Sequence, residues 1–563
     1  MQRNPLLFPV VAALFLAVTL NGCKTSSTPG AAAATRSRDL TPNEYQNLSD
    51  EEKAKYKDVV IRIPFGWGGI QLPKDAYPWE TPVDKAIHGG EIATMVGLYN
   101  QTLFELQHPR VKVEYILFDM WTDNFRSALA VALSARRAPS YYIARDLPQT
   151  IEQGMYADLT DLMKKWDRFD EMPEASVKEG TFNGRYFTLA ANELGAHIIR
   201  FRKDFFREAG IFDENGEPGP RSDWTFDDFA AICKKLTDPK KGRYGYASQM
   251  GDYGAPGHVF SLANGLDILY VPDPTGKRLW KLNDQDPDML KSLQVTRKMI
   301  QEDRSVYTSV TMGWQEWHNE FDAGRASMIS GFSPHVPGES LDQPDKFGAD
   351  KPYREVVGMA ILPHGPGGMS GMKQQTNPVG FDPSMTPEQL EAAFDWCKSW
   401  FYGDIFINRI RATTQEARAK GRASRLYMEL LTLPYKPTED LLDKPLSAVF
   451  PKNYLDTYDR IRKAPAPPLP REFGLREPPM AEWVRAMKAM YSEAATSKTD
   501  LKVILKKTAD LVGNNLLNYR DPQDSDRLRR FYAARSEFYR KHFPRYYESV
   551  WLKKLPLYHR IPQ

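Results

Sequence analysis

The chain has 563 residues and a formal net charge of +3, so it is long enough for two or more domains and nearly balanced in charge. This balance gives no indication of nucleic-acid binding. Aromatic residues make up 12% of the chain and include 12 tryptophans, which suit flat apolar binding surfaces.

The N-terminus has the pattern of an export signal. Arg3 is the only charged residue before an apolar run at Leu6–Leu20, which is too short to span a membrane. We therefore expect a signal peptide at residues 1–22. The stretch Leu20–Cys23 resembles the lipobox of bacterial lipoproteins, which implies that Cys23 receives a lipid and becomes the first residue of the mature chain.

A small-residue, polar stretch follows the signal. Residues 23–57 are predicted to form a lipidated tether that carries a globular body. Two acyl chains make a stable membrane anchor, so we expect a location in the cell envelope, on the periplasmic or extracellular face of a membrane. The alternative is an ordinary signal peptide with a chance cysteine.

Two cysteines remain in the body of the chain. Cys233 and Cys397 both lie in helical patterns, and the sequence leaves open whether they pair. The spacing of Cys and His residues does not suggest zinc, so we expect neither a metal nor a cofactor.

Strand patterns then alternate with helical patterns. Strands are predicted at Val59–Gly69, Val111–Asp119 and Ser140–Asp146, and helices at Glu91–Pro109 and Asp123–Pro139. Such alternation favours a parallel sheet. Ligands on these sheets bind at the carboxyl ends of strands, which selects the loops Gly66–Gly69, Asp119–Asp123 and Arg145–Asp146.

An ordered series of short motifs comes next. It begins with a turn that ends in Asp-Leu (Gly154–Leu159), a hairpin with Gly-Arg-Tyr (Gly184–Tyr186) and a hinge block (Phe201–Gly210). It continues with a helix start that contains Trp-Thr-Phe (Trp224–Phe229), a strand entry with the pattern Phe-x-x-Gly-x-Ala-x-Met (Phe321–Met328) and the loop Pro-His-Gly-Pro-Gly-Gly (Pro363–Gly368). Over residues 59–517 this order resembles bacterial extracellular solute-binding protein family 1, the maltose-binding-protein-like lipoproteins of ABC sugar importers. Phe201-Arg202 departs from the Tyr-Asn usual in that family.

The resemblance implies an α/β, two-lobed periplasmic-binding-protein fold with discontinuous lobes joined by a hinge. The first lobe is expected at residues 58–190 plus 376–445, and the second at 191–375 plus 446–520. A basic, aromatic-rich C-terminal extension occupies 521–563. Of two interpretations of this extension, a helix packed on the lobe with a solvated basic face is favoured over contact with anionic lipid headgroups.

Three local features carry structural expectations. Ser222 or Asp223 is expected to cap the helix that begins near Trp224. Gly210 is expected to end a helix, where a positive φ is needed. The proline-rich stretch Lys463–Phe473 is predicted to be a surface loop.

The implied function is that of a receptor, not an enzyme. It would bind a sugar or oligosaccharide between the lobes as a monomer and deliver it to the transmembrane permease subunits of an ABC transporter. The sequence contains no Gly-x-Ser-x-Gly elbow, His-Glu-x-x-His pair or phosphate-binding loop. The alternative is a secreted glycan-binding or glycan-degrading lipoprotein without transport, because acidic residues are abundant enough to form a catalytic pair.

A sugar presents flat C–H faces and a rim of hydroxyl groups, which aromatic and planar polar side chains bind. The candidate ligand-binding residues are Trp67, Trp121, Arg145, Asp146, Asn192, Glu193, Trp314, Phe332 and Trp483. Burial in a core is the alternative for each aromatic. Trp317 is expected to pack within a helix, and His197, His258 and His318 are expected to be structural or surface residues.

Overall fold

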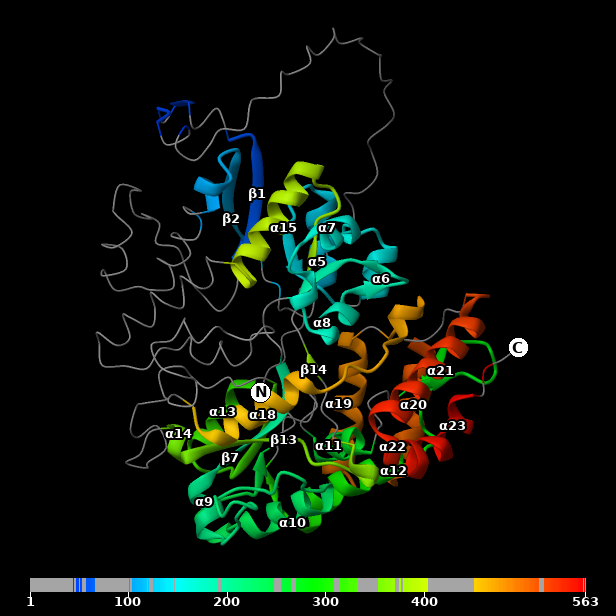
Figure 1. Ribbon diagram of the computed structural model, residues 1–563. Coiled ribbons are helices and arrows are strands. Elements are labelled where there is room, and N and C mark those ends of the chain that lie inside the picture. The colour runs from blue at the N-terminus through cyan, green and yellow to red at the C-terminus, as the bar shows by residue number, and fades with distance from the viewer. Residues whose placement is uncertain are drawn as a thin grey trace, which may run out of the picture.

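The computed structural model has two lobes, one above the other in Figure 1. It describes residues 44, 47–49, 51–52, 57–65, 101, 104–118, 120, 125–145, 147–190, 195–247, 255–264, 270–307, 314–332, 353–369, 374–375, 378–403, 450–478, 480–515, 521–559 and 561. Among these residues, no helix has both the length and the apolar character needed to cross a membrane.

The first lobe contains two small sheets. β1 (Val59–Phe65) pairs in parallel with β2 (Val111–Leu117). β15 (Pro378–Phe381) lies antiparallel between β3 (Tyr141–Ile143) and β6 (Thr188–Ala190). Strands are therefore present in all three predicted regions, and β3 is shorter than its sequence pattern.

Helices pack around these sheets (Figure 1). Alternation in β1 directs Ile61 and Ile63 into a core with Phe394 and Trp396. The remaining elements of this lobe are α5 (Phe125–Ser134), α6 (Leu147–Glu152), α7 (Thr160–Lys165), η1 (Phe169–Glu171), α8 (Glu174–Glu179), the hairpin β4 (Thr181–Phe182) and β5 (Arg185–Tyr186), and α15 (Pro387–Phe401).

The second lobe is built on a larger mixed sheet with the strand order β11-β8-β12-β7-β13, and β14 pairs with the start of β7. β7 runs antiparallel to β12 and β13, whereas β8 is parallel to β11 and β12. The strands are β7 (Gly195–Arg202), β8 (Tyr246–Ala247), β11 (Val306–Tyr307), β12 (Met328–Phe332), β13 (Val357–Ile361) and β14 (Gln374–Gln375).

Many helices surround this sheet. They are α9 (Lys203–Glu208), α10 (Phe226–Leu236), η2 (Pro239–Lys241), α11 (Pro256–Ala263), α12 (Pro287–Arg297), η3 (Lys298–Glu302), α13 (Trp314–Asp322), α14 (Tyr353–Val356), η4 (Pro366–Gly368), α18 (Lys452–Lys463), η7 (Pro470–Phe473), α19 (Met480–Thr496) and α20 (Leu501–Asn515). A separate hairpin joins β9 (Tyr270–Pro272) to β10 (Trp280–Leu282).

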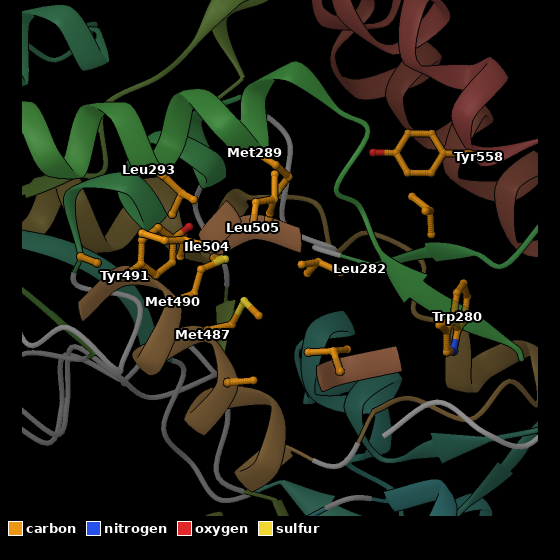
Figure 2. Close-up of a cluster of buried hydrophobic side chains, with 14 of the residues drawn as sticks. Trp280, Leu282, Met289, Leu293, Met487, Met490, Tyr491, Ile504, Leu505 and Tyr558 are labelled. Atoms are coloured by element: carbon orange, nitrogen blue, oxygen red, sulfur yellow. The ribbon is translucent and has the colours of Figure 1, made fainter. Parts of the chain in front are cut away.

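The second lobe has two hydrophobic cores. The sheet core lies beneath β7, β8 and β12 and is centred on Phe201, Phe206, Phe229 and Met328. The helical core lies among β9, β10, α12, α19 and α20 and extends from Tyr491, beside Met490, to Trp280 on β10 (Figure 2). Two cores within one lobe reflect two kinds of layer, helix on sheet and helix on helix.

The C-terminal segment belongs to the helical core. It forms α21 (Asp524–His542), α22 (Pro544–Tyr546), η8 (Tyr547–Trp551) and α23 (Leu552–Tyr558). Phe531, Tyr546 and Trp551 are all buried there. On the opposite side of α21, Arg529 and Arg540 are exposed, so the helix has one packed face and one charged, solvated face.

The described elements show three passages between the lobes, which make both lobes discontinuous. The chain goes from β6 to β7, returns from β14 to β15, and goes again from α15 to α18. Each lobe therefore depends on segments that are far apart in the sequence.

Two local expectations are wrong. The cap of α10 is Thr225 rather than Ser222 or Asp223: its hydroxyl accepts the Asp228 N–H at 3.1 Å, and Asp228 accepts the Thr225 N–H at 2.8 Å. The prediction of a surface loop at 463–473 is wrong only in its degree of exposure: residues 464–469 form no helix or strand and Lys463 is exposed, but residues 464–473 are buried or half-buried.

Two other local questions are settled. Gly210 ends α9 with φ of +63°, as predicted. Cys233 and Cys397 are free thiols in the cores of different lobes, so they do not pair. Burial raises the pKa of both thiols well above its usual range.

Candidate functional site

The strand directions place one edge of each sheet towards the boundary between the lobes. β7 begins where the chain arrives from the first lobe, and Phe332 at the carboxyl end of β12 pairs with His197 near that beginning. In the first lobe, β15 begins where the chain arrives from the second lobe, and Val379 at its start pairs with Ile143 at the carboxyl end of β3. Both sheets therefore turn their strand ends, the usual ligand side of such sheets, towards the other lobe.

Arg145 follows β3 at this edge of the first lobe. Its backbone is fixed because its N–H donates to the Tyr156 hydroxyl at 2.9 Å and its carbonyl accepts from the Thr150 hydroxyl at 2.9 Å. The guanidinium lies 5.8 Å from the ring centroid of Phe125, and the residue is half-buried. This arrangement presents a fixed cation, backed by an aromatic ring, at the boundary between the lobes.

A buried polar cluster supports the corresponding edge of the second lobe. Arg200 on β7 donates through Nη2 to Nδ1 of His318 at 2.7 Å, and its guanidinium lies 5.9 Å from the Phe321 ring centroid. The indole N–H of Trp317 donates to the carbonyl of Ala247, the last residue of β8, at 3.0 Å. The cluster thereby attaches α13 to the sheet next to the strand ends.

This cluster agrees with the expectations for Trp317 and His318 and adds Arg200. Trp317 is buried within the lobe, and His318 has a structural role, as the sequence predicted. Arg200 was not among the candidates. The signal that could have found it is a charged residue inside a strand pattern, because a strand next to a core buries such a side chain only with polar partners.

Trp483 lies at the rim of the helical core, in the first turn of α19. Its ring meets Tyr270 edge-on, with centroids 5.5 Å apart, and Tyr270 in turn meets Trp280 at 4.9 Å. The indole N–H of Trp280 donates to the Arg476 carbonyl at 2.6 Å. Trp483 is only half-buried, so part of its surface is available to a ligand.

Several candidate side chains lie outside the part of the chain that the structure describes. Trp314 is the first residue of α13 and Phe332 is the last of β12, but their side chains are outside the described part of the chain. The other candidates outside the described residues are Trp67, Trp121, Asp146, Asn192 and Glu193, together with the proposed lipidation site Cys23.

A cavity of about 430 Å³ lies elsewhere in the second lobe. It is lined by the loop before α12 and by α20, including Asp284, Asp286, Lys502 and Asp510. Its lining includes neither first-lobe residues nor any candidate ligand-binding residue. Within the described part of the chain, no cluster of three or more His, Cys, Asp or Glu side chains could hold a metal ion.

Comparison with known proteins decides the family. Residues 77–396, more than half of the chain, match the model of the bacterial extracellular solute-binding protein family. The chain belongs to this family. No curated protein matches the chain in sequence.

Solved solute-binding structures share the two-lobed fold. The ABC substrate-binding protein Lmo0181 from Listeria monocytogenes, in complex with cycloalternan, has a TM-score of 0.54 at 16% identity over 81% of this chain and 98% of that chain. The maltose-bound MalE3 of T. maritima has a TM-score of 0.52 at 18% identity over 81% and 99%. A solute-binding protein from Agrobacterium radiobacter K84 with ribitol has a TM-score of 0.55 at 16% identity over 82% and 99%. The predicted two-lobed fold is therefore confirmed.

Proposed function

We propose that the protein is a membrane-anchored receptor that binds a sugar, an oligosaccharide or a sugar alcohol between its lobes and delivers it to an ABC permease. The observation that carries this proposal is the family match, together with strand ends of both lobes that are turned towards each other. The ligands bound to the structural neighbours, namely cycloalternan, maltose and ribitol, support a carbohydrate-type ligand.

The proposed contacts combine charge and flat apolar surface. Arg145 would bond hydroxyl groups from the first lobe, and Trp483 would cover a sugar face from the second. The remaining proposed contacts are Trp67, Trp121, Asp146, Asn192, Glu193, Trp314 and Phe332. Ligand that touches both lobes favours their closed arrangement, and the closed form would dock on the permease.

The proposal is tested with a panel of carbohydrates. Purified protein is titrated with maltooligosaccharides, cyclic glucans and sugar alcohols, and the same mixtures are analysed for cleavage products. We expect binding without product formation. Released reducing ends that disappear when a single acidic residue is replaced would instead identify a glycan-degrading enzyme.

The anchor is tested separately. Cys23→Ser should leave the protein unanchored or uncleaved, because the proposed lipid attachment atom is lost. Membrane partition is measured by fractionation after the signal peptide is removed. A Cys23→Ser protein that still partitions into membranes once its signal peptide has been removed would contradict the proposed lipid anchor.

A further inference from the structure

The segment 464–478, which we call the strap, is a covered strip of chain between the lobes. Five of its 15 residues are prolines, and the structure describes every residue, none of them exposed. Proline has no N–H group, so a proline-rich segment can be buried with fewer backbone donors left to satisfy.

The strap is bonded to the first lobe along its whole length. Lys178 of α8 donates to the Ala466 carbonyl at 2.6 Å. Around Arg471 two bonds run in opposite directions: its guanidinium donates to the Glu179 carbonyl at 3.1 Å, and its carbonyl accepts the Asn183 N–H at 3.1 Å.

The C-terminal end of the strap makes two more contacts with the first lobe. The side-chain amide of Gln149 on α6 donates to the Glu477 carbonyl. Arg476 forms an ion pair with Glu152 of the same helix at 2.6 Å, with side chains that are 32% and 35% exposed. These contacts involve α6, α8 and the β4–β5 hairpin, so they spread over one side of the lobe.

The other side of the strap is held by the second lobe and above all by α21. Arg535 of α21 is buried and donates to the Pro468 carbonyl at 3.2 Å. Phe473 packs on Phe531, with ring centroids 5.8 Å apart. Gly474 has a φ of +75°, which favours glycine, and an added Cβ there would lie 3.3 Å both from Nε of Arg527 on α21 and from Oδ1 of Asn183 in the first lobe.

Rotation of one lobe against the other must disturb these bonds. Hydrogen bonds weaken steeply when their distance or angle changes, and the strap is fixed to the second lobe while its polar groups reach the first. We propose that the strap is a latch: it stabilises the arrangement of the lobes seen here, and α21 keeps it rigid. The inference rests on the proposed function only for its effect on ligand affinity.

The ligand-free experiment measures the distance between the lobes. Lys164 in the first lobe and Lys240 in the second are both exposed and are replaced by cysteines for spin labels. The background carries Cys23→Ser, and Cys233 and Cys397 are buried, so the labels go to the new thiols. Distance distributions then give the populations of the lobe arrangements without any ligand.

The variants remove one cross-lobe ion pair. Arg476→Gln, Glu152→Gln and the double variant are compared with Arg529→Gln, which removes a 2.6 Å pair with Asp526 inside α21. We expect each strap variant to lower the population of the lobe arrangement seen here, relative to other arrangements, by about two- to five-fold, which is the effect of a partly exposed ion pair. The control should leave this ratio unchanged. The double variant should do no more than either single variant, because both remove the same interaction.

Ligand affinity provides the second readout. Carbohydrate affinity should change in proportion to the fraction of ligand-free protein that is in the binding arrangement. Unchanged distance distributions in folded Arg476→Gln and Glu152→Gln would overturn the latch. If Arg476→Gln fails to fold, Glu152→Gln decides the matter, because it leaves the strap sequence intact. Absence of carbohydrate binding would overturn the proposed function but not the distance result.

Discussion

The sheet core and the helical core of the second lobe hold their large side chains in different ways. In the sheet core, aromatic rings pack on one another and a polar tip is bonded to a strand carbonyl: Phe229 meets Trp224 with centroids 5.9 Å apart, and the indole N–H of Trp224 donates to the Ile361 carbonyl of β13 at 3.0 Å. In the helical core, polar tips are bonded to other side chains: the indole N–H of Trp551 donates to the Ser536 hydroxyl at 2.9 Å, and the Tyr491 hydroxyl lies 3.3 Å from the Ser292 hydroxyl.

Buried cations occur in both regions but have different partners, since Arg200 on β7 donates to His318 whereas Lys554 pairs with carboxylates. Lys554 of α23 lies between Asp286 and Asp288 at the start of α12, with N–O distances of 3.1 and 2.6 Å. Such pairs are directional and costly to leave incomplete, so they specify which helix packs where more than they add stability. A sheet therefore offers strand carbonyls to the helices packed on it, whereas a layer of helices relies on bonds between side chains to set its register.

The largest expected effects test whether the two cores unfold together. Trp280→Ala in the helical core and Phe229→Ala in the sheet core should each lower the free energy of unfolding by about 3–5 kcal/mol. Both side chains are almost fully buried. Calorimetry should show one transition in each variant if the lobe is cooperative. A separate early transition in Trp280→Ala alone would show that the helical core unfolds independently.

A pair of neighbouring glycines tests the contact between α22 and the 363–368 loop. Gly367 and Gly368 have φ of +79° and +75°, but an added Cβ at Gly367 would lie 2.5 Å from Cα of Tyr546, whereas at Gly368 nothing lies within 4 Å. Gly368→Ala should cost about 1–2 kcal/mol from backbone strain alone. Gly367→Ala should cost about 1–3 kcal/mol more because backbone must move.

Chemical denaturation of both glycine variants provides the measurement. Equal losses in the two variants would contradict the close packing of α22 on this loop. The matched φ angles make Gly368→Ala the control for strain.

The rim of the helical core is tested with Trp483→Ala. If the exposed part of this ring covers a sugar, the variant should lose about tenfold in affinity, equivalent to about 1.4 kcal/mol, with little change in melting temperature. Phe212→Ala is the control, because Phe212 is 46% exposed and is not a candidate ligand contact. A strongly lowered melting temperature with unchanged affinity would assign Trp483 to the core instead of the site.

The smallest effect concerns charge at the rim of the sheet core. Glu208 ends α9 and pairs with Arg243 at 2.7 Å and with Lys241. Hydrogen bonds from Arg243 and then Lys241 lower the pKa of Glu208 from 4.5 to about 2. Because the folded pKa is depressed, the stabilisation is complete above pH 4.5 and is lost as the pH falls through about 2.

Glu208→Gln should therefore destabilise the protein at pH 7 by about 0.5–1 kcal/mol, since Glu208 is 45% exposed and solvent screens the pair. Melting temperatures of the two proteins, measured from pH 7 down to pH 2, should converge in acid. A difference that stays constant over this range would contradict an ionic contribution.

Local pattern was sufficient for much of the fold. Periodicity and backbone preference act over a few residues, so they can be seen in the sequence alone. They predicted the buried alternation of Val59, Ile61 and Ile63, the end of a helix at Gly210 and the burial of Trp317. The order of the motifs also predicted the two-lobed fold. For the site, the sequence led to Arg145 and Trp483, which the structure places at a strand end and at a half-exposed rim.

Tertiary contacts decided the rest. Three side chains before α10 are able to cap a helix, namely Ser222, Asp223 and Thr225. Thr225 is the cap in the structure, and the next residue, Phe226, is bonded to a distant loop through its N–H, which donates to the His364 carbonyl at 3.0 Å. The prolines of the strap predict a loop but not its burial, which depends on Lys178 and α21. Such contacts join residues that are far apart in the sequence, so their energies depend on the assembled lobes, and local sequence pattern cannot carry that information.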